Sequence, residues 1–448
     1  MSKNLMDTQT PYSSGWRAGR NDRNEPSFIK NLLKRPLLLL LILFTGASAA
    51  ASLFFVGGWI FSETSQASND PSLKRVPVSV HKKMEAPSPP LQLKDLNIDI
   101  NKISSRFSLE TSGETLLVES SLDRDLQEYI SDLLQTSGTL KAAVVVLRPD
   151  DGRILAMVSY DQGGDVGDLC LQADFPAASL FKIVVAAAAV ESAGFTPEKN
   201  VYFNGGKHTL YKKQLKRKIG KYTNKTTFKK AFGLSINPVF GKLGIYWLGQ
   251  RGLSESAEKF LFNHAIPFDF PVETSVVNVP EDDYGLAEIS SGFNRQTMVS
   301  PLHAALISSI IVNNGILMKP WIIKSISGEN GNILYETKPE EVVSPISSET
   351  ADALRVLMRD TISSGTCRTS FSRVKRKKVF KDVELGAKTG TINDETGQYK
   401  YDWLTAYAIP PGKNGKSICI AILGVHGKKL GRRANRLGRD IINHYLSS

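Results

Sequence analysis

Apolar residues recur first with a helical period and then with strand-like alternation where the globular part of the chain begins. The stretch LDRDLQEYISDLLQ (122–135) has leucine or isoleucine at every fourth position, which predicts a helix. The next stretch, AAVVVLRPDDGRILAMVSY (142–160), predicts two strands joined by a Pro-Asp-Asp-Gly turn. Just upstream, the alternation within residues 105–122 predicts a short hairpin.

The C-terminal end has the same kinds of element in the opposite order, strands first and then a helix. Residues 383–427 predict three short strands, and residues 433–446 predict a closing helix. The pattern between them, over 176–370, is mostly helical. Because antiparallel neighbours need only short connections, we expect the five strands of the two ends to form one antiparallel sheet. Helices would cover both faces of this sheet, in an α/β (α+β) fold.

The N-terminal part carries a long apolar run of another kind. Residues 37–61 contain no charged side chain and are long enough to cross a bilayer as a helix. Residues 1–35 are basic, so the positive-inside rule predicts a cytoplasmic tail and places everything after Phe61 outside the membrane. A cleaved signal peptide is the alternative, because Ala-Ser-Ala at 47–49 resembles a cleavage site. The apolar run continues well past it, which favours an uncleaved anchor.

Composition and charge add limits to this picture. Residues 62–106 are rich in Ser, Pro and Lys without a persistent period, which is typical of a tether, and the globular domain is expected over 107–448. The net charge of +12 makes an anionic partner or surface worth considering. Three separate cysteines and six scattered histidines show no metal-ligand spacing and are too few for a disulfide framework. We therefore expect no metal and no cofactor.

The chemistry begins at PAASLFKIVVAAAAVESAG (176–194), where Ser179 and Lys182 stand three apart at the start of a predicted helix. Side chains at this spacing share one helix face, and a helix N-terminus offers free N–H groups. A lysine whose pKa is lowered could remove the proton of such a serine, and the N–H groups could stabilise an oxyanion. Ser-x-x-Lys occurs five times in the chain, so a capping serine and a solvated lysine explain the pair equally well on their own.

Two further stretches carry residues of the same chemistry. Ser235 and Asn237, in FGLSINPVF, could relay a proton and hold a substrate amide, although both are also common turn residues. Lys388, Thr389 and Gly390, in AKTGTIND, suit a strand along which a peptide with a terminal carboxylate could lie. A lysine that protects an edge strand is the alternative.

Together and in this order, the three motifs resemble those of penicillin-binding proteins and serine β-lactamases, with Ile236 where the second motif has Asp. The long separation between Ser235 and Lys388 is similar to that of the transpeptidase domain of high-molecular-weight penicillin-binding proteins. The stretches SSLDRDLQEYI, 285–320 and DWLTAYA also resemble this domain, with Asn294 and Ser300 as departures. The resemblance covers about residues 115–446 and implies the β-lactamase/transpeptidase-like fold.

The resemblance implies a serine acyltransferase that acts on the D-Ala-D-Ala ends of peptidoglycan stem peptides and is acylated by β-lactams. By motif match, Ser179 is the nucleophile and Lys182 its base, while Ser235 helps return a proton to the leaving D-Ala. Asn237 would hold the acyl-side amide. Lys388, Thr389 and Thr391, with Gly390 between them, would receive the terminal carboxylate, and the backbone N–H groups of the nucleophile and Thr391 would form the oxyanion hole.

Relatives with this resemblance carry a further module before the domain, and here only the tether precedes it. We therefore expect a lone transpeptidase domain on a bacterial plasma-membrane anchor, with its catalytic domain extracytoplasmic. A separate glycosyltransferase or wall-assembly protein is a candidate partner, and no nucleic acid is expected.

The motifs leave several functions open. A D,D-carboxypeptidase uses the same serine ester, and a β-lactam sensor or wall-binding scaffold would also acylate. A β-lactamase would need a water-activating base that the sequence does not identify. The basic stretch 207–222 could contact an anionic wall polymer, a phospholipid or an acidic partner, or be a solvated surface.

Overall fold

The computed structural model describes residues 103–448 apart from 112–113, 165–166, 373, 375–376 and 413–415, together with four positions between 93 and 100. The apolar run 37–61, its basic flank and most of the tether lie outside the described residues. Within the described part, none of the helices combines the length and the apolar character that a membrane crossing requires.

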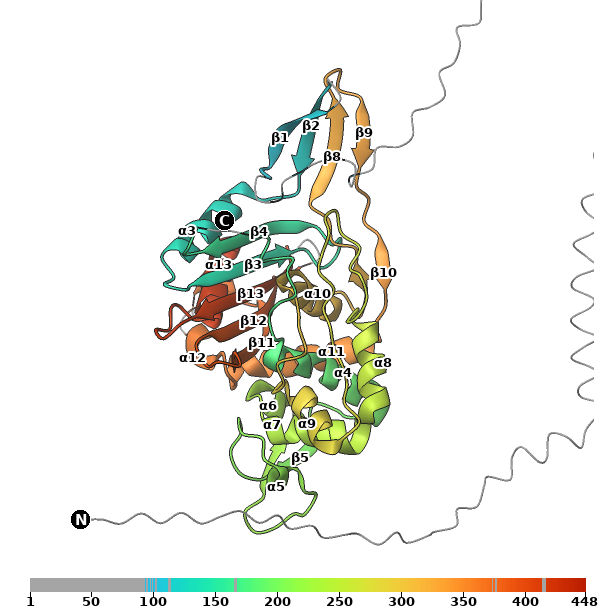
Figure 1. Ribbon diagram of the computed structural model, residues 1–448, viewed down its shortest axis with the longest axis vertical. Helices are drawn as coiled ribbons and strands as arrows, with labels where there is room; N and C mark the ends of the chain where they lie inside the picture. The colour runs from blue at the N-terminus through green and yellow to red at the C-terminus, as the bar shows by residue number, and fades with distance from the viewer. Residues whose placement is uncertain are drawn as a thin grey trace, which may run out of the picture. The chain divides into compact units, whose positions relative to one another are not determined.

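A five-stranded antiparallel sheet forms the centre of the domain, as the hydrophobic pattern predicts (Figure 1). The two N-terminal strands add to the three C-terminal ones through the β13–β3 pair, in which Ile420 lies opposite Val146. All four strand pairs are antiparallel, and β11 and β4 are the edge strands. The strands, in sheet order, are β11 (Glu384–Asn393), β12 (Lys400–Ile409), β13 (Ile418–His426), β3 (Lys141–Leu147) and β4 (Ile154–Asp161).

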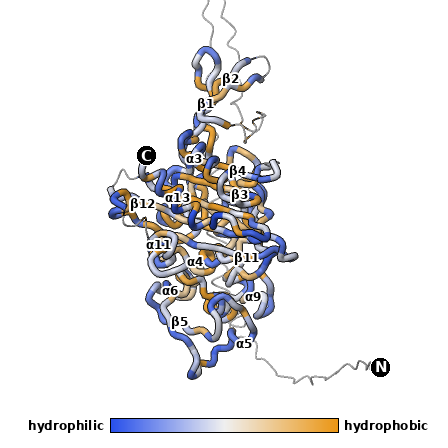
Figure 2. The backbone as a smooth tube through the Cα atoms, turned by 90° about the vertical axis from the view of Figure 1, so that its left-hand side faces the viewer, coloured by the Kyte–Doolittle hydropathy of each residue, from blue (hydrophilic) through white to orange (hydrophobic). Residues whose placement is uncertain are grey.

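Alternate residues of these strands enter two separate cores, because successive side chains of a strand point to opposite faces. Val144 and Ile422 pack with α3 (Arg124–Gln135) and α13 (Ala434–Ser447) on one face. Val145 and Leu423 belong to the core of the other face, with α10 (Pro301–Val312). Both faces are therefore covered by helices, as the sequence predicts. In Figure 2 the orange, hydrophobic parts of the tube lie mainly in this layered region near β3.

The long middle of the chain is mainly helical, as its pattern predicts. Its helices pack next to β11 and α10 and supply several walls of the site described below (Figure 1). Two short two-stranded antiparallel sheets interrupt them, β5–β6 and β7–β10. The helices are α4 (Lys182–Ala193), α5 (Lys212–Leu215), α6 (Phe228–Gly233), α7 (Asn237–Leu243), α8 (Gly249–Lys259), α9 (Asp283–Ser291), α11 (Ser348–Ser363) and α12 (Arg368–Phe371). The strands of these two small sheets are β5 (Asn200–Phe203), β6 (Asn224–Thr227), β7 (Leu317–Met318) and β10 (Glu341–Val343).

A second sheet is the main feature that the pattern does not reveal. The predicted hairpin is present as β1 (Arg106–Thr111) and β2 (Glu114–Ser120). It is extended by β8 (Ile323–Gly328) and β9 (Ile333–Glu336), which gives the order β1-β2-β8-β9. The prediction of a mostly helical middle is therefore incomplete at these two strands. Strand β8 pairs with β2 across some two hundred residues, and β9 pairs with β8. Local periodicity carries no signal of the long-range β2–β8 pairing.

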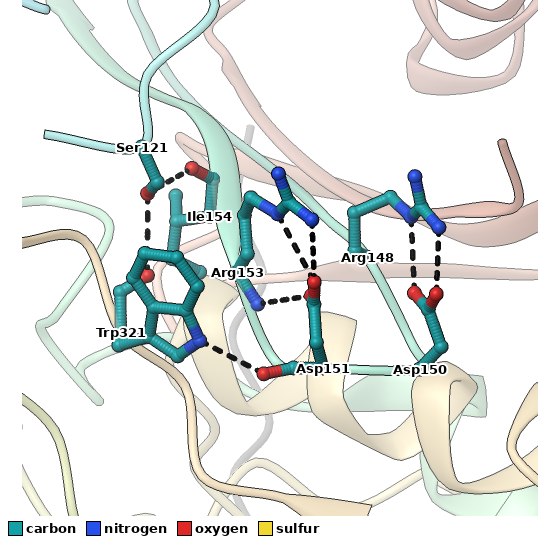
Figure 3. A network of polar contacts seen from close by, with 7 residues as sticks. All are labelled: Ser121, Arg148, Asp150, Asp151, Arg153, Ile154 and Trp321. Carbon is teal, nitrogen blue, oxygen red and sulfur yellow. Dashed lines mark hydrogen bonds and ion pairs between the residues drawn. The ribbon is translucent and has the colours of Figure 1, made fainter. Parts of the chain in front are cut away.

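A network of polar contacts joins the second sheet to the β3–β4 turn (Figure 3). Ser121, directly after β2, donates a hydrogen bond to the carbonyl of Ile154 at 2.6 Å. Trp321, shortly before β8, donates its indole N–H to the carbonyl of Asp151 at 2.8 Å. The side chain of Asp151 in turn accepts from Arg153. These contacts fix the predicted Pro-Asp-Asp-Gly turn beneath the second sheet.

Candidate active site

The nucleophile candidate Ser179 lies on a short 3₁₀ turn, Ala178–Phe181, and α4 begins only at Lys182. The predicted helix start is thus a tighter turn, although the predicted contact is present. Lys182 donates a hydrogen bond from Nζ to Oγ of Ser179 at 2.7 Å. Ala178 has a φ of 48°, a conformation that is costly for a residue with a Cβ and that often marks functional sites.

Lys182 is fully buried, and none of its hydrogen-bond partners in the described part of the chain is a carboxylate. Its Nζ donates to Oδ1 of Asn237 at 2.9 Å and to the carbonyl of Ser291, and it lies 5.6 Å from the ring centroid of Phe240. Burial, with a further contribution from the charge of Lys388, lowers the pKa of Lys182 well below its usual value. The lowered pKa favours the neutral form of Lys182, which can accept the proton of Ser179.

Ser235 and Asn237 occupy the connection between α6 and α7. Ser235 has a φ of 53°, and Asn237 begins α7 ahead of a proline that favours a helix start. Asn237 donates from Nδ2 to the carbonyl of His208 at 3.1 Å, so its amide orientation is fixed from both sides. Ile236, the departure from the family motif, is buried in the core. An apolar residue therefore suits this position, which faces away from the cavity.

Lys388 lies on β11 and is fully buried. Its Nζ donates to Oγ of Ser235 at 3.0 Å and to the carbonyl of Thr389 at 2.7 Å, and it lies 5.6 Å from the ring centroid of Phe232. Burial lowers the pKa of Lys388 to about 7. The side chain borders Ser235 and is not among the residues that line the cavity. Lys388 therefore acts on the cavity indirectly. It donates a hydrogen bond to Ser235, and its charge disfavours protonation of Lys182.

Glycine at position 390 allows β11 to approach the nucleophile turn closely. A Cβ there would lie 3.3 Å from the carbonyl oxygen of Ala177, from Cβ of Ala178 and from the backbone nitrogen of Ser179. The carbonyls of Thr389 and Asn393 accept side-chain hydrogen bonds from Lys388 and Arg295. Since alternate residues of a strand present their backbone groups to the same edge, the N–H of Thr391 points the same way, away from β12.

An open cavity of about 480 Å³ connects these groups. It brings together Ser179, Ser235, Asn237, Thr389 and Thr391, as the sequence predicts. It also contains residues that the sequence did not indicate. Its lining residues are Ser179, His208, Ser235, Asn237, Gly292, Phe293, Arg295, Thr366, Thr389, Thr391, Ile392, Asn393 and Lys400.

Three of the additional residues come from loops distant in sequence. Thr366, in the turn after α11, lies 2.6 Å from Thr389, hydroxyl to hydroxyl. His208 belongs to the basic stretch 207–222, whose residues, His208 included, are mostly exposed. Arg295 follows α9 and reaches β11. No periodic signal marks any of these positions. The basic character of 207–222 was the one feature that could have drawn attention to His208.

An ion pair between Asp402 and Arg433 holds the side chain of Thr391 in place. Thr391 donates from Oγ1 to Oδ1 of Asp402 on the neighbouring strand at 3.2 Å, and Arg433 binds both carboxylate oxygens of Asp402 at 2.7 Å. Burial would raise the pKa of Asp402, but His426 and Arg433 hold it at about 2. The carboxylate therefore stays charged and fixes the Thr391 side chain. Among the described residues there is no cluster of His, Cys, Asp and Glu that could hold a metal ion.

The fold and the buried Ser-Lys pair agree with the family that the three motifs resemble. The family model of the penicillin-binding protein transpeptidase domain matches residues 142–443, and the chain belongs to this family. This confirms the resemblance that the three motifs indicate.

Curated relatives are similar at modest identity. The chain is 25% identical over 334 residues to penicillin-binding protein PbpB of Mycolicibacterium smegmatis, covering 67% of this chain and 49% of that protein. It is 25% identical over 350 residues to peptidoglycan D,D-transpeptidase PbpA of the same organism, covering 68% and 66%. For peptidoglycan D,D-transpeptidase MrdA of Haemophilus influenzae the values are 28% over 375 residues, 73% and 56%. The chain thus spans about half to two thirds of these relatives' lengths.

Solved structures support the fold. Penicillin-binding protein A from M. tuberculosis, as an imipenem acyl-enzyme complex, superposes with a TM-score of 0.61 at 24% identity, covering 73% of this chain and 79% of that one. The D,D-transpeptidase domain of a peptidoglycan glycosyltransferase from Eggerthella lenta gives 0.60 at 23%, covering 74% and 82%. The predicted transpeptidase-like fold of the domain is therefore confirmed.

Proposed function

We propose that this protein is a penicillin-binding serine D,D-transpeptidase that cross-links the stem peptides of peptidoglycan. The observation that carries the proposal is the hydrogen bond of 2.7 Å between buried Lys182 and Ser179, at the wall of a cavity that also contains Ser235, Asn237 and Thr391. Family membership and the names of the curated relatives support the same activity.

In the first step, Oγ of Ser179 attacks the carbonyl between the two terminal D-Ala residues while Lys182 accepts its proton. The oxyanion would lie between the backbone N–H groups of Ser179 and Thr391, which the close approach at Gly390 brings near each other. The amide bond breaks, an ester to Ser179 forms, and the departing amine of D-Ala needs a proton. Ser235, in contact with Lys388, is placed to deliver it.

In the second step, an amine from a neighbouring stem attacks the ester. A new amide bond forms, the proton of the amine leaves through the same basic groups, and the hydroxyl of Ser179 is restored. Asn237 would hold the acyl-side amide during both steps. Thr389 and Thr391, with Thr366 beside them, would bind the terminal carboxylate of the donor.

The lining of the cavity favours transfer to an amine over rapid hydrolysis. Fast hydrolysis of the ester would need a general base for water, and none of the cavity-lining residues in the described part of the chain is Asp or Glu. The same feature predicts a long-lived ester with a β-lactam, which is why we propose β-lactams as covalent inhibitors.

Incubating the full-length chain with pentapeptide-containing peptidoglycan and an acceptor amine is expected to produce new cross-linked dimers. Mass spectrometry of the muropeptides measures them, and they should disappear in the Ser179→Ala variant. Tetrapeptide monomers without dimers would instead identify a D,D-carboxypeptidase. Release of at most one equivalent of D-Ala would identify a sensor or scaffold, and catalytic loss of nitrocefin a β-lactamase.

We further propose that residues 37–61 anchor the protein in the plasma membrane, with the N-terminus cytoplasmic and the domain outside. Of two single cysteine substitutions in intact cells, one at Ser88 is expected to react with a membrane-impermeant thiol reagent and one at Ser14 is not. The three natural cysteines are buried, which keeps the background low. The reverse labelling pattern would overturn this orientation. In the proposed orientation, a separate glycosyltransferase would work beside the domain on the same side of the membrane.

A further inference from the structure

Two cations line the catalytic cavity beyond the groups that the mechanism uses. Arg295 donates from Nε to the carbonyl of Asn393 at 2.9 Å, which places its guanidinium group at the edge of β11. Lys400, on β12, lies opposite Asn393 in the strand register and lines the same cavity. Both side chains are partly exposed. Both are placed at the end of the β11–β12 pair by their relation to Asn393.

The positive charge at this end of the cavity has no ion-pair partner among the described residues. Within the described part of the chain, neither Arg295 nor Lys400 forms an ion pair, whereas Arg433 on the far side of Thr391 binds both oxygens of Asp402. Glu288 is near enough to Arg295 to feel its charge but not within ion-pair distance. Charged groups left without a partner in a substrate cavity favour a ligand of the opposite sign.

Strand β11 gives the position of these cations relative to the reacting bond. Thr389 contacts Thr366, and its carbonyl shares the Lys388 ammonium group with Ser235, where the leaving residue and its carboxylate belong. Thr391 directly follows Gly390, which approaches the nucleophile turn. Asn393 is a further ~7 Å along the strand, because residues rise by about 3.4 Å each. A donor peptide running antiparallel to β11 would therefore place its acyl residue at Thr391 and its preceding residues toward Arg295 and Lys400.

We propose that Arg295 and Lys400 form a subsite for a carboxylate on the donor stem, one or two residues before the acyl D-Ala. This inference rests on the proposed function and names its substrate class, an anionic donor. Two stem positions can supply the group: the distal carboxylate of a diaminopimelate-type third residue, or the free α-carboxylate of a γ-linked second glutamate. A lysine in third position would instead bring an ammonium group that the two cations repel.

The test compares four pentapeptide donors ending in D-Ala-D-Ala, with the full-length chain and D-Ala release as the readout. One carries both carboxylates, one is amidated at the third residue, one is amidated at the second, and one is amidated at both. We expect kcat/KM to fall about 10-fold when the recognised carboxylate is amidated, as for a lost charged hydrogen bond at a partly exposed site. The two donors that are amidated at one residue only identify which carboxylate the protein recognises.

The Arg295→Gln/Lys400→Gln double variant is expected to lose this preference, so that its donors differ by less than about 2-fold. In Lys221→Gln, which removes an exposed cation of the basic stretch outside the cavity, the preference should remain. Equal kcat/KM for all four donors in the unmodified chain would overturn the subsite while leaving the proposed function standing. A preference that survives in the double variant would also overturn it. Turnover of none of the donors by a chain that benzylpenicillin still labels would overturn the proposed function and the subsite with it.

Discussion

The Ser179→Ala variant is expected to lose all covalent labelling by a fluorescent penicillin. A β-lactam mimics acyl-D-Ala-D-Ala, and ring opening leaves it esterified to the nucleophile. Ser179 lines the cavity, and its hydroxyl accepts a hydrogen bond from fully buried Lys182, the candidate base. Without its oxygen no ester can form, so the loss should be complete and not partial. Gel fluorescence after incubation with the labelled drug measures it.

A matched control lies in α8, where Ser256 and Lys259 repeat the same Ser-x-x-Lys spacing outside the cavity. Ser256 donates to the carbonyl of Val184, a structural contact. Ser256→Ala should therefore label as fully as the unmodified chain. Labelling that persists in Ser179→Ala would place the nucleophile elsewhere and refute the assignment.

The central sheet could be predicted from the sequence because its signal is local. Strands such as β13, in which nearly every residue is apolar, are recognisable one by one, and the two helix-covered faces follow from their lack of polar alternation. The second sheet could not be predicted in the same way. Its β2–β8 pair joins Val118 to Ile326, and nothing in the short strand β8 indicates its partner. Long-range pairing is decided by packing of the complete fold.

The candidate site likewise combines local contacts, which the sequence predicts, with long-range contacts, which it does not. The contact between Ser179 and Lys182 is local, since three residues of helical chain bring the side chains together. Position alone does not give Lys388 its direction toward Ser235, and the tertiary fold brings Thr366 to Thr389 and Arg295 to Asn393. Family resemblance supplied the roles of the motif residues. It could not supply residues that lie outside the motifs.

Replacing Lys182 with methionine is expected to slow acylation by benzylpenicillin by about 10²–10⁴-fold, the usual contribution of a positioned general base. Methionine fills much of the same buried volume without a charge. Because the folded state lowers the pKa of this lysine, folding near neutral pH opposes its protonation, and the lysine destabilises the fold there. The variant should therefore unfold at the same or a higher temperature, which separates lost catalysis from lost folding. Acylation within a few-fold of the unmodified rate would exclude Lys182 as the base.

The pH dependence of acylation tests the same role without removing the base. The rate should rise with pH as Lys182 loses its proton, and the midpoint should lie well below the usual lysine pKa. The charge of Lys388, whose own pKa is about 7, contributes to that lowering. In Lys388→Met the repulsion is absent, protonated Lys182 is easier to form, and its pKa rises. The acid limb of the profile, measured by stopped-flow acylation, should therefore move to higher pH in this variant even if the plateau rate also falls. An unchanged limb would show that the two buried lysines do not act on each other.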